Sequence, residues 1–290
     1  MTVRVILIAD DYALTTGVSR AICELAGAGR LSGTSALVTR PGWPDDADLL
    51  RPLRDHLAIG LHFNLTLGEP LGAMPIFAPQ GRLPSVSTVT RGAILGMLPE
   101  PDIEAEFARQ LEAFEVALGA PPDFIDGHQH VHALPGIRNC LFRVLQACVT
   151  PLGILLRDPS DRALAISRRG VAPVKALLIA NLARGFGLAA RRRGYITNGS
   201  FAGISNFDAA TVESEFASAA TYASTRHLIM CHPGFSDAGL EALDSVTTRR
   251  NAEFDFLLEA NDFTRLVWRA KRASDGRIQW PGMGYGASHA

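Results

Sequence analysis

The residues of this chain that could do chemistry are most concentrated in Asp126-Gly127-His128-Gln129-His130-Val131-His132. Imidazole is the commonest metal ligand in proteins and carries protons near neutral pH. On an extended backbone, alternate side chains point the same way, so His128, His130 and His132 would share one face with Asp126. We therefore expect a metal or catalytic site here. The alternative is a polar loop whose histidines bond to the backbone.

Other polar residues directly follow short apolar runs. They are Asp10, Asp11, His62, Arg157 and His232. Asp11 with His62 and His128 would form a two-histidine, one-carboxylate set that suits Zn²⁺, Fe²⁺, Mn²⁺ or Ni²⁺, with weak Mg²⁺ binding also open. Such a metal would polarise a carbonyl and lower the pKa of its water.

Two residues could move protons beside this set. Asp10 would face the attacking water as a base, and His232 would protonate the leaving group, which completes metal-assisted amide hydrolysis. Taken singly, each residue has another explanation. Asp10 and Asp11 could cap a helix, and His62 could be a core histidine with its hydrogen bonds satisfied. His232 could belong to a loop before proline. Their joint occurrence at strand ends favours the site. Cys231, beside His232, would point the other way and act as a buried apolar residue.

Short apolar runs predict the strands of a sheet. They cover residues 3–9, 33–38, 57–65, 123–126, 153–157 and 227–232, with a closing strand at 263–269. The intervening amphipathic stretches predict helices, capped by Thr15 or Thr16 and by Asp102, and the glycine-rich residues 195–203 predict a loop. Strand followed by helix, repeated, predicts a parallel sheet with helices outside. Its carboxyl ends are where (β/α) barrels and doubly wound sheets bind ligands.

Composition limits the alternatives. The chain has 290 residues, enough for one large α/β domain or two small ones, and its formal net charge of −1 gives no indication of a nucleic-acid or acidic-membrane partner. Its four cysteines form no Cys-x-x-Cys pair, so we expect a reducing cytoplasm. No run of eighteen apolar residues predicts a membrane span. Residues 66–101 predict a long excursion over one face, and residues 283–290 a frayed end.

Four blocks of the sequence resemble the YdjC-like carbohydrate deacetylases, which include the chitooligosaccharide deacetylase. The blocks occur in the family's order. They are Ile8-Ala9-Asp10-Asp11-Tyr12, Ile59-Gly60-Leu61-His62-Phe63-Asn64-Leu65-Thr66, Asp126-Gly127-His128-Gln129-His130-Val131-His132 and Met230-Cys231-His232-Pro233-Gly234. Together they are specific, whereas each alone is not.

The resemblance implies a single domain over residues 1–290. Its fold class would be α/β, with an irregular (β/α) TIM-like barrel of the glycoside hydrolase/deacetylase type. It implies one divalent metal ion, Mg²⁺ or Zn²⁺, held at Asp11, His62 and His128, with Asp10 as base. The implied reaction removes an N-acetyl group from an amino sugar, and a homodimer is plausible. Residues expected to touch or support the sugar are Asn64, His130, His132 and Arg157; His132 could instead tie down its loop.

The sequence also departs from the family pattern. Tyr12 stands where the family usually has Phe, and Gly127 and Gln129 replace the usual Ser and His, so pocket contacts could differ. Residues 66–101 and 160–205 match nothing in the family and are expected to shape the sugar site. Two other hypotheses stay open: another metal-dependent hydrolase or isomerase on the same barrel, and a sugar-binding protein without catalysis.

Overall fold

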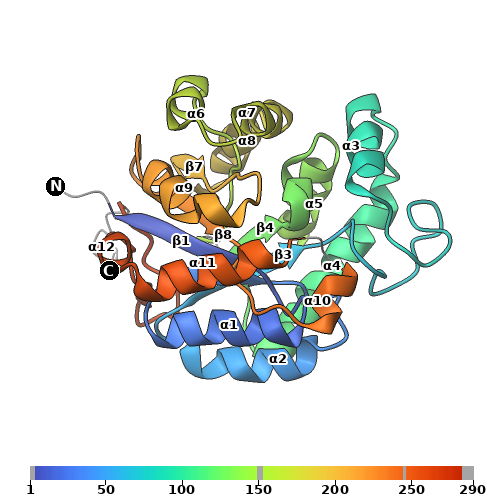
Figure 1. The fold of residues 1–290 in the computed structure, drawn as a ribbon. Helices are drawn as coiled ribbons and strands as arrows, with labels where there is room; N and C mark the ends of the chain where they lie inside the picture. Colours follow the sequence, from blue (N-terminus) through green and yellow to red (C-terminus); the bar gives the residue numbers. More distant parts are fainter. Residues whose placement is uncertain (1–3, 149–152, 244–245, 283–290) are drawn as a thin grey trace, which may run out of the picture.

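The computed structural model describes residues 4–148, 153–243 and 246–282. In these residues, eight strands form one sheet, and every pairing is parallel, as predicted (Figure 1). In sheet order they are β6 (Ile196–Thr197), β5 (Leu155–Leu156), β4 (Phe124–Gly127), β3 (Ala58–Phe63), β2 (Gly33–Ala36), β1 (Val5–Tyr12), β8 (His227–Cys231) and β7 (Ser200–Ala202).

The two edges of the sheet meet at a short junction. Only Asn198 and Gly199 separate the edge strands β6 and β7 in the chain, so the sheet curls into an irregular (β/α) barrel. Asn198 secures the junction: its side-chain oxygen accepts from the Asp158 amide at 2.7 Å, and its side-chain nitrogen donates to the Asp158 carbonyl at 2.8 Å. The predicted fold class is confirmed.

Strand β1 lies between β2 and β8, and its side chains contribute to two separate parts of the core. Successive side chains of a strand point to opposite faces. Val5, Leu7 and Ala9 therefore pack with the surrounding helices, whereas Ile6 and Ile8 belong to a separate apolar cluster that also holds Trp268 and Trp280. The Trp268 amide donates to the Val5 carbonyl at 2.8 Å, which places Trp268 at the amino end of β1.

Helices cover the outside of the sheet. They are α1 (Thr16–Gly27), α2 (Trp43–Leu50), α4 (Glu100–Leu118), α5 (Ile137–Ala147), α9 (Val212–Ala219), α10 (Ala238–Leu243), α11 (Thr248–Glu259) and α12 (Asn261–Thr264). Thr15 caps α1, since its hydroxyl accepts from the Val18 amide at 3.4 Å. Gly119, with a φ of 70°, ends α4 in the left-handed region that glycine adopts without strain.

Four further helices stand beyond the barrel, at the top of Figure 1. They are α3 (Val86–Leu95), α6 (Ala163–Arg169), α7 (Pro173–Leu182) and α8 (Phe186–Arg192). The excursion at residues 66–101 thus contains a helix that its irregular sequence does not predict. Among the described residues, no helix is long and apolar enough to cross a membrane.

Three local predictions are wrong. Asp102 lies inside α4, and its carboxylate instead accepts from the Ile76 and Phe77 amides at 2.8 Å each, which ties down the preceding loop. Residues 195–203 hold β6 and β7 rather than a loop. Residues 263–269 form no strand; Val267 makes only an isolated bridge to Val5. Residue 3 and residues 283–290 lie outside the described part of the chain.

Candidate metal and active site

A cavity of about 540 Å³ opens at the carboxyl ends of the strands. Its floor holds Asp10, Asp11, His62, His128 and His232, which come from the ends of four different strands or the segments after them. Parallel strands end at one edge of the sheet, so residues distant in sequence meet there. His130 lines the same cavity, so the structure brings six of the predicted site residues together.

Asp10 and Asp11 are neighbours in β1, yet both line the cavity. Regular alternation would turn one of them away. The register of β1 against β2 shifts between Ala9 and Tyr12, and Asp11 has a left-handed φ of 66°. Such an irregularity re-aims a side chain and costs free energy, and it is common next to active sites. This local distortion is the reason that both carboxylates face the same space.

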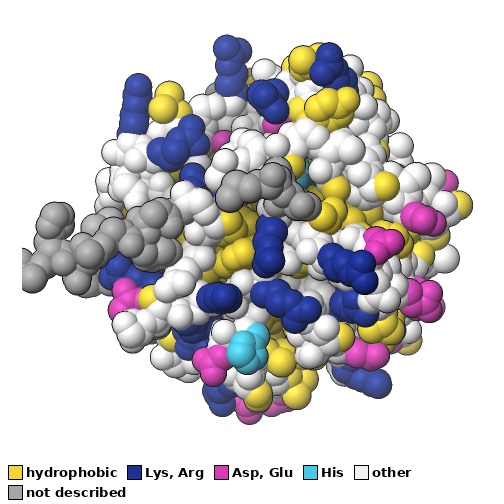
Figure 2. Space-filling view, turned by 90° about the vertical axis from the view of Figure 1, so that its left-hand side faces the viewer, with side chains coloured by type: hydrophobic (Ala, Val, Ile, Leu, Met, Phe, Trp, Pro, Cys, Tyr) yellow, Lys and Arg dark blue, Asp and Glu magenta, His cyan; other side chains and the backbone are white. Residues whose placement is uncertain are grey.

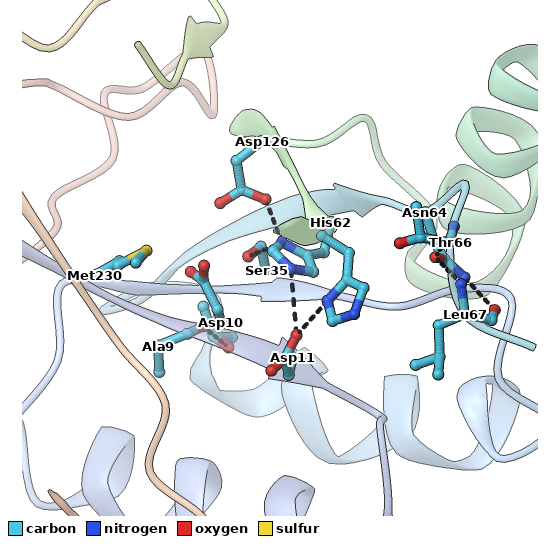
Figure 3. Close-up of polar contacts among 12 residues, drawn as sticks. Ala9, Asp10, Asp11, Ser35, His62, Asn64, Thr66, Leu67, Asp126 and Met230 are labelled. Atoms are coloured by element: carbon cyan, nitrogen blue, oxygen red, sulfur yellow. Dashed lines mark hydrogen bonds and ion pairs between the residues drawn. The ribbon is translucent and has the colours of Figure 1, made fainter. Parts of the chain in front are cut away.

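Asp11, His62 and His128 form a compact group of possible ligands. Figure 3 shows His62 between Asp11 and Asp126. Asp11 Oδ1 lies 3.3 Å from His62 Nε2 and 3.0 Å from His128 Nδ1, and the three ligand atoms lie within 4.8 Å of one another. Metal–ligand bonds of about 2.1 Å place neighbouring ligand atoms about 3.0–3.4 Å apart. The spacing therefore fits a divalent ion with two histidines and one carboxylate.

His62 is held in the orientation that such a ligand requires. Its Nδ1 lies 2.6 Å from Asp126 Oδ1 and 3.0 Å from the Ser35 hydroxyl, while Nε2 faces Asp11 (Figure 3). A proton on Nδ1 is bound by the Asp126 carboxylate, which leaves the Nε2 lone pair directed at the metal position. Burial lowers the pKa of His62, but Asp126 and Asp11 outweigh it and raise the pKa to about 10. This position attracts a cation.

The second oxygen of the Asp11 carboxylate accepts a hydrogen bond from another charged residue. Arg250, in α11, donates to Asp11 Oδ2 at 2.7 Å. Burial raises the pKa of Asp11, but Arg250 and His128 hold it well below its usual value. The carboxylate is therefore ionised, with one oxygen directed at the histidines. The sequence pattern gives no indication of Arg250, since it is one of two adjacent arginines at the start of α11, far along the chain from Asp11.

Arg157 binds Asp10 from beneath the cavity. Its guanidinium is fully buried and donates to both oxygens of Asp10, at 2.6 and 2.5 Å, and it also pairs with Asp126. Although burial lowers the pKa of Arg157, the two carboxylates raise it above its ordinary value. Arg157 does not line the cavity. Its position suits orientation of Asp10 and places the guanidinium behind the cavity wall.

The histidine-rich stretch is not extended, so the prediction that its histidines share one face is wrong. β4 ends at Gly127, and residues His128–Ala133 form a 3₁₀ segment in which Gln129 and His130 have left-handed φ values of 53° and 61°. His128 turns to Asp11, and His130 lines the cavity with its ring 5.7 Å from that of Phe201.

His132 and Asn64 lie behind the cavity wall. Buried His132 donates from Nε2 to the Arg157 carbonyl at 2.7 Å, and burial lowers its pKa to about 4, so it is neutral at pH 7. The Asn64 side chain accepts from the Thr66 and Leu67 amides and donates to the Leu67 carbonyl, which fixes the turn after β3. Both side chains stabilise the loops that carry the cavity-lining residues.

His232 directly follows β8. Its backbone amide donates to Glu253 at 2.6 Å, and its ring contacts Phe207 with 5.5 Å between centroids. Burial lowers the pKa of His232, and the nearby Asp11 and Asp10 oppose this effect only in part. His232 lines the same cavity as Asp10.

Known proteins are similar to this chain in sequence and in fold. The YdjC-like protein family matches residues 4–265. A chitooligosaccharide deacetylase of Serratia marcescens is 37% identical over 54% of this chain and 62% of its own length. The chitooligosaccharide deacetylase of Proteus mirabilis is 33% identical over 54% of this chain and 58% of its own length. The chain therefore spans about three fifths of these two relatives.

A crystal structure from Enterococcus faecalis, of a proposed cellobiose-phosphate cleavage protein, has the same fold. Its TM-score is 0.67 at 19% identity, with 92% of this chain and 94% of that chain covered. At this level of identity the likeness concerns the fold alone. The barrel architecture is therefore shared over nearly the full length of both chains.

Proposed function

The chain belongs to the YdjC-like family, and from this and the site geometry we propose that it is a metal-dependent carbohydrate N-deacetylase. The observation that carries the proposal is the meeting of Asp11, His62 and His128 beside Asp10 in one cavity. The names of the Serratia and Proteus relatives support the reaction class.

The proposed cofactor is one divalent metal ion, Mg²⁺ or Zn²⁺, held by Asp11, His62 and His128. The donor set of two imidazoles and one carboxylate suits Zn²⁺ particularly well. When bound, such an ion polarises a carbonyl and lowers the pKa of water. Asp126 fixes the ring of His62, and Arg250 fixes the carboxylate of Asp11, so the donor atoms are positioned before any ligand arrives.

Asp10 and His232 divide the proton transfers between them. Asp10, oriented by Arg157, takes a proton from the water whose oxygen attacks the acetamide carbonyl carbon. His232 gives a proton to the nitrogen as the carbon–nitrogen bond breaks. The products are acetate and a free amine on the sugar.

The proposed substrate is an N-acetylated amino sugar, either N-acetylglucosamine or an oligosaccharide or glycoconjugate that contains it. A cavity of about 540 Å³ is within the size range of small-molecule sites. His130 lines this cavity and is placed to contact sugar hydroxyls. Asn64, His132 and Arg157 act indirectly. Asn64 and His132 stabilise the loops that carry cavity-lining residues, and Arg157 orients Asp10.

The decisive variant is His128→Ala. His128 is half-buried, so the substitution should leave the fold intact while it removes one of the three ligands. We expect loss of bound metal and loss of acetate release from N-acetylglucosamine and its short β-1,4 oligomers, with an unchanged circular dichroism spectrum. His56→Ala, an exposed histidine distant from the cavity, is the matched control and should behave as wild type. Acetate release that survives His128→Ala would refute the proposal.

A further inference from the structure

The helices α6, α7 and α8 carry an unusual balance of charge. Residues 162–193 contain eight basic residues and no acidic residue, in a chain whose net charge is −1. The basic residues are Arg162, Arg168, Arg169, Lys175, Arg184, Arg191, Arg192 and Arg193. Among the described residues, only Arg169 of these eight forms an ion pair, with Asp161. Asp158 also lies near Arg191, and Glu215 near Lys175. The least compensated positive charge of this segment therefore lies on Arg162, Arg168, Arg184, Arg192 and Arg193.

The same helices expose apolar side chains. Val174 is 80% exposed, Leu164 62% and Leu178 58%, and Leu177 and Leu188 are exposed as well. Helix α7, with the sequence PVKALLIANL, is apolar on nearly all sides. A helix of that kind is normally buried, and a cluster of exposed apolar residues marks an interaction surface. In the space-filling view, apolar and basic side chains lie together at the top of the molecule (Figure 2).

We propose that α6, α7 and α8 form a docking surface for an anionic lipid bilayer. Apolar side chains that enter the interface and basic side chains that face acidic headgroups are together the requirements for such binding. The helices are short and lie on the surface, in keeping with the absence of any membrane-crossing helix in the described residues. The binding is therefore peripheral.

A second copy of the chain is a poorer occupant of this surface. A two-fold contact places the same patch against itself, so a stable one needs complementary charges within the patch. Here arginine would face arginine, because no acidic residue occurs between Arg162 and Phe207. A bilayer that contains acidic lipids supplies the missing negative charge.

The surface adjoins the cavity. Lys175, Leu178 and Leu182 of α7 line the cavity wall, and Leu178 is also exposed at the outside. Docking through α7 therefore sets the cavity mouth beside the lipid headgroups. The inference concerns binding alone and holds whatever reaction the cavity carries out.

The test is sedimentation of the full chain with vesicles of phosphatidylcholine alone or mixed with phosphatidylglycerol. We expect binding only to the mixed vesicles, weakened by added salt. The double variant Val174→Asp/Leu177→Asp should bind about tenfold more weakly or worse, since it loses apolar contact and adds negative charge. Val116→Asp is the matched control: Val116 is 77% exposed on α4, and this variant should bind as wild type.

Charge is tested by Arg184→Glu/Arg192→Glu, which should also reduce binding to mixed vesicles by about tenfold. Its control is Arg265→Glu, at an exposed arginine of another region. Three outcomes would overturn the proposal: no binding of wild type to mixed vesicles, equal binding to both vesicle types, or a dimer in solution that Val174→Asp dissociates. The last outcome would assign the surface to a second copy of the chain.

Discussion

His62 and His227 are both buried on strands of one sheet, yet they are in opposite chemical states. Each has a serine hydroxyl near Nδ1, Ser35 at 3.0 Å and Ser200 at 2.7 Å. His227 donates from Nε2 to the Ala219 carbonyl at 2.8 Å, and burial lowers its pKa to about 4. For His62, the carboxylates of Asp126 and Asp11 overcome burial and raise the pKa to about 10.

The difference shows how two carboxylates change the preferred charge of a buried histidine. Burial alone favours the neutral ring, as at His227. Two carboxylates within hydrogen-bonding distance reverse this preference, and at His62 they do so at the end of the strand that opens into the cavity. His227 lies at the amino end of β8 and contributes to stability only.

The largest expected effect comes from the arginine that balances the carboxylates around His62. Arg157→Met would leave Asp10 and Asp126 buried without their partner, and removing one member of a buried ion pair costs about 3–5 kcal/mol. Arg143→Met is the control, because Arg143 also contacts two carboxylates, Glu100 and Glu104, but on the surface. It should cost about 1 kcal/mol or less. Urea denaturation measures both, and equal losses would contradict the assignment.

A smaller effect is expected from the two groups on Nδ1 of His62. Asp126→Asn keeps the shape of the side chain but weakens its hydrogen bond to Nδ1 of His62. Metal affinity should therefore fall by about 10- to 100-fold. Ser35→Ala removes only the longer, neutral contact and should change affinity less. Titration of the metal-free protein with Zn²⁺ and Mg²⁺ decides the order. If Ser35→Ala had the larger effect, the orientation inferred for His62 would be wrong.

The smallest expected effect is the pH dependence caused by His227. Its folded pKa of about 4 lies below the unfolded value of about 6.5, so the unfolded chain binds more protons as the pH falls. Stability should therefore be lost between about pH 6.5 and 4, amounting to about 1 kcal/mol at pH 5.5 relative to pH 7.5. His227→Gln should remove this contribution to the slope of unfolding free energy against pH. An unchanged slope would show that His227 titrates normally.

The sequence predicts the positions of the site residues better than their directions. Asp11 and His62 follow apolar runs, and parallel strands bring such residues to one edge, which is sufficient to predict their meeting. The left-handed backbone at Asp11, His130 and Gln129 has no such pattern, because none of these residues is a glycine. The alternation rule therefore fails at the histidine stretch.

Contacts between distant segments and very short elements are also beyond the sequence pattern. Arg250 contacts Asp11 although 239 positions separate them in the chain, and the local sequence around either residue does not predict that contact. Strands β6 and β7 have two and three residues, too few to show any periodicity. Their residues become strands because the neighbouring strands β5 and β8 offer unpaired edges.

The central place of β1 affects how the chain folds during synthesis. β1 pairs with β8, so Val5 can form this pairing only after His227 has been synthesised. At about 5–20 residues per second, a ribosome needs roughly 10 to 40 seconds to make the intervening chain. Throughout that interval one edge of a buried strand, whose first five residues are apolar, stays unpaired and can join another chain. Folding yield should therefore depend on chaperones that shield the nascent amino terminus.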